Sequence, residues 1–187
     1  MCPNPVDRSW DLYGRVAGRG WVFIRSQCFG ARPPAYVPPT VTPAMVLSEL
    51  RRVGLPALDV SVQPAGKTLV NLDTIFFTEP RPVDVDLTIL GQAVEVEATP
   101  TTYVWSFGDG TGLTTTTPGA AYPSKDVVHR YSHAGVTVRP AVSVVYGARF
   151  RVGGGAWQDV DGTVTIPGPA QGLRVAEAAP VLSGERS

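Results

Sequence analysis

The sequence predicts a mainly β protein built as a β-sandwich. Alternation of apolar and polar residues recurs in short runs between residues 56 and 182, as in VDVDLTI at 83–89. Turn-forming residues separate these runs, and the 187 residues include 20 glycines and 18 prolines. Many short strands joined by regular turns are typical of a sandwich.

The N-terminal segment is expected to form a separate hairpin. Residues 10–28 contain two aromatic and β-branched runs on either side of the turn AGRG. Residues 30–39, GARPPAYVPP, are typical of an extended proline-rich linker. We therefore assign residues 1–38 to this hairpin and its linker.

Two cysteines, Cys2 and Cys28, bracket the hairpin, and neither has a Cys or His nearby at metal-ligand spacing. A structural disulfide is expected, worth about 3 kcal/mol in the chain-entropy model. The alternative is two unrelated free thiols. A disulfide persists in oxidising compartments, which predicts a secreted or cell-surface protein. The start, MCPNP, lacks the regions of a signal peptide, so we expect a mature or trimmed chain with an added Met, or a lipid-anchored cysteine, although no lipobox supports the anchor.

One short helix is predicted at 43–53, within a segment assigned as 39–55. Thr42 suits the N-cap, Pro43 the first helical position and Gly54 the C-terminal end. The apolar residues at helical spacing are Val46, Leu47, Leu50 and Val53.

The predicted strands then follow one another to the C-terminus. The runs are ALDVSVQP, TLVNLDTIFFTE, VDVDLTI, QAVEVEATP, TYVWSF, VTVRPAVSVVYGARFRV, AWQDV, TVTI and GLRVAEAAPVL. The pair Asp161-Gly162 between two runs predicts a tight hairpin. We assign 56–182 to the sandwich, with extra hairpins at its C-terminal end, and 183–187 to a tail.

Charge and composition favour a folded domain without a strong attraction for nucleic acid or membrane. The formal charge is zero, the pI is about 6.7 and 43% of the residues are hydrophobic. No apolar stretch is long enough to cross a bilayer. The positive charge is concentrated in residues 1–38, which contain five arginines and two aspartates.

Candidate catalytic and nucleotide-binding motifs are incomplete. PAGKT at 64–68 lacks the first glycine of a phosphate-binding loop, because Ser61 stands there, and a strand is expected after it where a helix is needed. His129 and His133 lie at a strand end, where their spacing separates them by roughly 13 Å. No metal site, nucleophilic serine elbow or carboxylate to orient a histidine is apparent, so no enzyme is expected.

Two binding interpretations remain open. Asp109, Asp159 and Asp161 could meet at one end of a sandwich and bind Ca²⁺, although aspartates in turns usually cap their own backbone. The larger aromatic set could form a platform for sugar, or instead fill the core and brace hairpins. Its members are Trp10, Tyr13, Trp21 and Trp157.

YVWSFGDG at 103–110 followed by VHRYSHAG at 128–135 resembles the PKD (polycystic kidney disease) domain, an immunoglobulin-like β-sandwich. The resemblance covers roughly residues 56–150. It implies that Trp105 lies in the core, that a turn is formed by Phe107, Gly108, Asp109 and Gly110, and that His129, Tyr131 and Gly135 belong to the next strand and its bend. Ser106 stands where the family usually has Asp, and Thr137 where it has an aromatic residue. The whole chain is also similar to secreted proteins of GC-rich bacteria that carry this domain behind a Cys-bracketed start.

We therefore expect a secreted or wall-associated, non-enzymatic binding or adhesion module that contacts an extracellular protein or a cell-wall glycan. The alternative is a structural subunit of an extracellular assembly, in which the hairpin pairs with an exposed sheet edge of a neighbour. An accessory domain of a secreted hydrolase is a third interpretation. PKD-like modules serve as spacers or contact surfaces, and a fold alone does not define a function.

Overall fold

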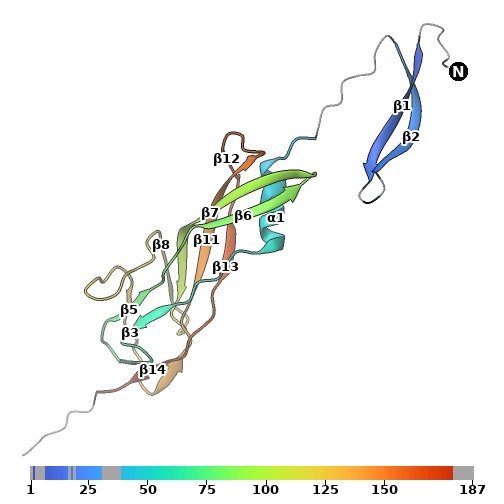
Figure 1. Cartoon of the computed structure of the whole chain (residues 1–187). Helices are drawn as coiled ribbons and strands as arrows, with labels where there is room; N and C mark the ends of the chain where they lie inside the picture. The colour runs from blue at the N-terminus through green and yellow to red at the C-terminus, as the bar shows by residue number, and fades with distance from the viewer. Residues whose placement is uncertain (1, 3–6, 17, 19, 31–38, 179–187) are drawn as a thin grey trace, which may run out of the picture. The chain divides into compact units, whose positions relative to one another are not determined.

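The computed structural model describes residues 2, 7–16, 18, 20–30 and 39–178. It divides the chain into two compact units, Met1–Thr40 and Val41–Ser187, which we describe separately (Figure 1). The tail expected at 183–187 lies outside the described residues.

The described part of the chain is mainly β, with one short helix. In chain order its elements are β1 (Arg8–Val16), β2 (Gly20–Phe29), α1 (Pro43–Val53), β3 (Ser61–Gln63), β4 (Lys67–Leu69), β5 (Thr74–Phe77), β6 (Val83–Ile89), β7 (Gln92–Ser106), β8 (Gly112–Thr115), β9 (Val128–His129), β10 (Val136–Val138), β11 (Ala141–Val152), β12 (Gln158–Asp159), β13 (Val164–Pro167) and β14 (Leu173–Ala176).

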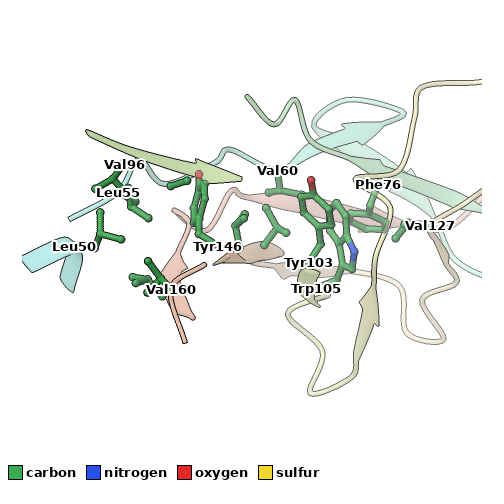
Figure 2. Packing of buried hydrophobic residues seen from close by; sticks show 14 of the residues in the cluster. Leu50, Leu55, Val60, Phe76, Val96, Tyr103, Trp105, Val127, Tyr146 and Val160 are labelled. Carbon is green, nitrogen blue, oxygen red and sulfur yellow. The ribbon is translucent and has the colours of Figure 1, made fainter. Parts of the chain in front are cut away.

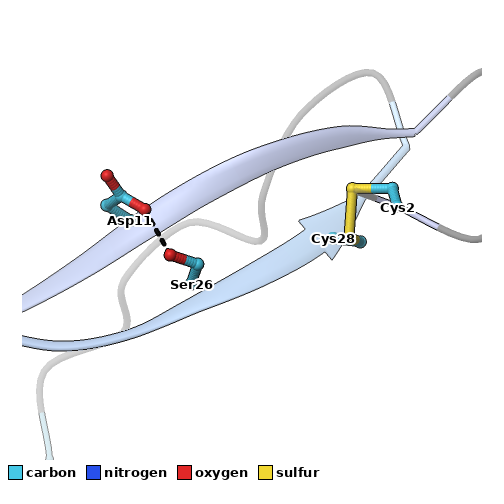
Figure 3. Close-up of a disulfide and its surroundings, with 4 residues drawn as sticks. All are labelled: Cys2, Asp11, Ser26 and Cys28. Atoms are coloured by element: carbon cyan, nitrogen blue, oxygen red, sulfur yellow. Dashed lines mark hydrogen bonds between the residues drawn. A yellow bond between two sulfur atoms is a disulfide. The ribbon is translucent and has the colours of Figure 1, made fainter.

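The first unit is the predicted hairpin. Strands β1 and β2 pair antiparallel from Arg8 opposite Phe29 to Val16 opposite Gly20, with a bulge where Ile24 has no opposite residue. A disulfide joins Cys2 to Cys28 across a Cα–Cα distance of 5.5 Å (Figure 3). The predicted bond is thus confirmed, and the described residues include no free cysteine.

The helix begins and ends where the sequence predicts. The Thr42 side chain accepts a hydrogen bond from the Met45 amide, and the Gly54 amide donates to the Leu50 carbonyl. Val46 and Leu50 are fully buried in the core of the second unit, so α1 packs on the sandwich, beside β6 and β13. Val53 is 54% exposed, contrary to the predicted apolar face, whereas Leu50 and Leu55 on either side of it in the sequence are buried.

The main sheet has the order β12-β11-β7-β6, with β13 pairing to β11 and β8 to β7. The two runs predicted around Pro100 form one strand of 15 residues, β7. A bulge accommodates the proline: Tyr146 faces Pro100, Val145 faces Thr102, and the extra Thr101 donates its hydroxyl to the Val145 carbonyl at 3.0 Å.

The hairpin predicted at Asp161-Gly162 is wrong. Strands β12 and β13 both pair with β11 and lie along the same side of it, so the chain passes Asp161-Gly162 without reversing direction. Val160 and Val164 are both buried in the core, and the Val160 amide donates to the Ala148 carbonyl. Residues 161–163 therefore interrupt one continuous strand direction, and the buried Val160 and Val164 fix the chain before and after them.

The run TLVNLDTIFF, predicted as one strand, contains a turn. β4 ends at Leu69, Asn71 adopts a positive φ of 59°, and β5 begins at Thr74. β4 pairs parallel to β14 in the sheet β10-β14-β4, whereas β5 lies in the sheet β3-β5-β9. The turn at Asn71 thus moves the chain from one sheet to another.

The core of the second unit is a single apolar cluster to which the main sheet, the smaller sheets and α1 contribute (Figure 2). Trp105 and Tyr146 come from the main sheet, Phe76 from β5, and Leu50 from α1. Side chains of one face of each sheet are buried between them, as expected for a sandwich-like fold.

Candidate functional site

The FGDG turn connects β7 and β8 and is closed by its own residues. The Phe107 amide donates to the Thr111 carbonyl, and Gly108 and Gly110 adopt φ angles of 81° and 90°. The Asp109 carboxylate accepts hydrogen bonds from the Thr111 amide and hydroxyl. The turn therefore has the geometry that glycine and aspartate permit, with the aspartate capping local backbone.

His129, the last residue of β9, contacts this turn. Its Nε2 lies 2.7 Å from Asp109 Oδ2, and its ring stacks on Phe107 with a centroid distance of 4.2 Å and an interplanar angle of 1°. This pair corrects the sequence interpretation, which found no carboxylate to orient a histidine. The signal was the motif itself, but the two residues lie 20 positions apart. His133 bonds instead to Ser132, so the structure does not bring the two histidines to one site.

The remaining motif residues are buried or hold neighbouring strands. The Tyr131 hydroxyl donates to the Phe107 carbonyl at 2.9 Å, and the Gly135 amide donates to the Val175 carbonyl at 2.8 Å. Trp105 is 2% exposed and donates its indole N–H to Thr115 Oγ1. These contacts make FGDG and HxY a structural brace.

The electrostatics of this brace favour an ionised aspartate and a neutral tyrosine. Burial alone would raise the pKa of Asp109, but hydrogen bonds from Thr111 and His129, with the electrostatic effect of His129, lower that pKa below its usual value. Burial, reinforced by the Asp109 charge, raises the pKa of Tyr131 above its usual value. The brace thus supplies no acid or base that titrates near neutrality from these two groups.

The four aromatic residues considered as a platform for sugar lie on different surfaces. Trp21, Tyr13 and Trp10 lie on the hairpin and are 71%, 51% and 39% exposed. Because side chains alternate along a strand, Tyr13 and Trp21 share one face, together with Phe23, whereas Trp10 lies on the other. Tyr13 and Phe23 form an edge-to-face pair with centroids 5.7 Å apart.

Trp157 belongs to the second unit and is half-buried under two arginines. The guanidinium carbons of Arg149 and Arg151 each lie 4.8 Å from the centre of its ring. Arg149 pairs with Glu97 and Arg151 with Glu95. Trp157 therefore packs in a salt-bridged layer on the sheet, against the guanidinium groups of both arginines.

Carboxylates gather on the outer face of the same sheet, close to its β6 edge. Asp84 lies opposite Glu97, and Asp86 opposite Glu95. Like charges directly opposite each other on neighbouring strands destabilise a sheet. The two glutamates are paired with arginines, but among the described residues neither aspartate has an ion-pair partner. The alternation predicted which side chains face outward, but not this cross-strand pairing.

The three aspartates considered for calcium do not meet. Asp109 follows Ser106, which pairs with Ala141, while Asp159 pairs with Arg149, eight positions along the same strand. At about 3.3 Å per residue the two ends are roughly 26 Å apart. Within the described residues, no group of three potential metal ligands is found.

The PAGKT segment at 64–68 is not followed by a helix. Gly66 forms a turn with a φ of 72°, and Lys67 begins β4. Phosphate-binding loops place the anion at a helix N-terminus, which this segment lacks.

A hollow of about 400 Å³ lies beside α1. The residues that line it include one serine, Ser48, but neither His129 nor His133.

No helix among the described residues is long and apolar enough to cross a membrane. Comparison of the chain with models of protein families, with curated proteins and with solved structures finds no match.

Proposed function

We propose that this protein is a secreted or cell-surface, non-enzymatic binding or adhesion module that contacts an extracellular protein or a wall glycan through its N-terminal hairpin. One observation carries this proposal: a hairpin of two strands leaves seven large apolar side chains at least 39% exposed. They are Trp10, Leu12, Tyr13, Trp21, Val22, Phe23 and Ile24. Large apolar side chains exposed in this number on one element mark an interaction site.

The disulfide supports both the location and the role. A two-stranded hairpin is at best marginally stable alone in water, so the Cys2–Cys28 bond is what allows it to exist as a unit. Such a bond is maintained in an oxidising compartment. The resemblance of roughly residues 56–150 to PKD domains agrees with a scaffold that presents a contact surface.

The aromatic cluster of Tyr13, Phe23 and Trp21 suits both proposed partner classes. Exposed Trp and Tyr rings stack on the apolar faces of sugars, and they also anchor protein interfaces. The neighbouring Arg15, opposite Trp21 in the hairpin, adds a cation that favours an anionic wall polymer or an acidic protein surface.

Binding to insoluble wall material tests this function. Oxidised protein is incubated with purified cell-wall sacculi, and the bound fraction is measured after sedimentation. We expect saturable binding, weakened about tenfold or more by Trp21→Ser. Tyr122→Ser is the matched control, because Tyr122 is 72% exposed on the second unit. Absence of binding both to sacculi and to extracellular proteins, or equal loss in the control, would overturn the proposal.

A second candidate function is a structural subunit of an extracellular assembly. The edge of β6 favours it: among the strands that the structure describes, β6 pairs only with β7, and an unpaired strand edge is a template for another strand.

A further inference from the structure

The hairpin exposes apolar side chains on both of its faces. The register places Trp10 and Leu12 on one face, and Tyr13 and Trp21 on the other. A segment that lies flat on a lipid or glycan surface needs only one apolar face. A hairpin that adds to a sheet edge turns one face toward the core of its partner, and either face of this hairpin offers apolar side chains for that contact.

The hairpin is also basic, and the second unit is acidic. Residues 1–40 contain five arginines and two aspartates, a formal charge of +3. Since the whole chain is formally neutral, residues 41–187 carry −3. In the hairpin, Arg25 lies on the same face as Trp10, and Arg15 on the same face as Trp21, so each face offers a cation beside its aromatic group.

The edge of β6 has the complementary features. Among the described strands β6 pairs only with β7, so one side of its seven residues is open. Val83, Val85 and Leu87 are half-buried at the rim of the core on the inner face. Asp84 and Asp86 are exposed on the outer face, beside the glutamates of β7.

We propose that the hairpin of one copy of this chain adds to the free edge of β6 in a second copy. The added strands continue the main sheet and cover Val83 and Leu87. They place the arginine of the outward hairpin face, Arg15 or Arg25, beside Asp84 and Asp86. The joint uses two different surfaces of each copy, so it is head-to-tail and generates chains or rings of subunits. This inference rests on the contact function proposed for the hairpin and names its partner.

Charge reversal on each surface tests the joint. The mass of full-length oxidised protein is measured by light scattering after size exclusion, over a wide range of concentrations. Wild type is expected to grow in mass with concentration. Asp84→Arg with Asp86→Arg, or Arg15→Glu with Arg25→Glu, is expected to weaken self-association at least about tenfold. Asp126→Arg, a reversal at another exposed aspartate of the second unit, is the control and is expected to behave as wild type.

Combining all four reversals in one chain is expected to restore self-association, which a misfolded variant could not do. Wild type that stays monomeric at every concentration, or reversals with no effect on mass, would overturn the joint. If such a monomer still binds sacculi or an extracellular protein through Trp21, only the second-copy partner is wrong. If it binds neither of them, the contact function itself also fails.

Discussion

Gly108 and Gly110 both adopt positive φ in the turn between β7 and β8, but their surroundings differ. A Cβ on Gly108 would lie 2.4 Å from the Arg139 amide nitrogen, whereas one on Gly110 would meet nothing within 4 Å. We expect Gly110→Ala to cost about 1–2 kcal/mol, the strain of a left-handed alanine. Gly108→Ala is expected to cost about 3 kcal/mol or more, because a backbone clash is added. Urea unfolding followed by tryptophan fluorescence measures both, and equal costs would contradict the close approach of the Arg139 backbone to Gly108.

Asp109 makes the stability of the second unit sensitive to acid. Although burial alone would raise its pKa, hydrogen bonds from Thr111 and His129 hold that pKa below the reference value of 3.8 in the folded state. The resulting stabilisation is therefore complete above about pH 4 and is lost as the pH falls through the lower, folded-state pKa. Asp109→Asn is expected to be less stable at neutral pH and to lose less stability on acidification. Urea unfolding at a series of pH values checks this, with Asp126→Asn as control; identical pH profiles of Asp109→Asn and wild type would contradict it.

For single residues, the FGDG and HxY motif predicted which side chains are buried, but not which side chains contact each other. Trp105 and the FGDG glycines could be placed because each residue type suits its local geometry. The contact of Asp109 with His129 could not be predicted, because it depends on where β9 lies relative to the turn. Likewise, the arginines over Trp157 follow from strand pairing between β7, β11 and β12, which no local pattern contains.

Among the elements, the hairpin depends most on one covalent bond. The disulfide closes a loop with a sequence separation of 26, worth about 3 kcal/mol. In Cys2→Ser with Cys28→Ser we expect β1 and β2 to lose their order while the second unit keeps its stability, because the units have separate contacts. Amide hydrogen exchange of residues 20–30 measures the first effect and urea unfolding the second. Unchanged protection of these amides after removal of the bond would contradict this dependence.

Element positions were largely predictable where alternation and capping agree. Helix α1 and strand β6 match the predicted ranges, 43–53 and 83–89. The Asp161-Gly162 hairpin was mispredicted because a two-residue turn signal is local. Whether the chain reverses there depends on Val160 and Val164, which both pack into the core beside β11. The division of TLVNLDTIFF between two sheets likewise depends on pairing with β14 and β3.

For the whole molecule, exposed surface and charge are distributed unequally between the units. The second unit buries most of its aromatic residues in one core, while the hairpin leaves Trp10, Tyr13, Trp21 and Phe23 exposed and its segment carries the excess of arginine. The sequence predicted the separate, Cys-bracketed segment from its composition and linker. The edge of β6, which is open among the described strands, could be found only from the order of the strands, and so could the carboxylates beside it that have no ion-pair partner in the described part of the chain.

Hydrogen exchange of the hairpin amides, in the free and the bound protein, tests most directly whether the hairpin makes the contact. The full oxidised chain is compared at low concentration, at high concentration and after adsorption to sacculi. We expect exchange at residues 7–16 and 20–30 to slow in a bound state, while exchange around Tyr122 stays unchanged. Hairpin amides that exchange equally fast in every bound state would contradict the assignment of the hairpin as the contact surface.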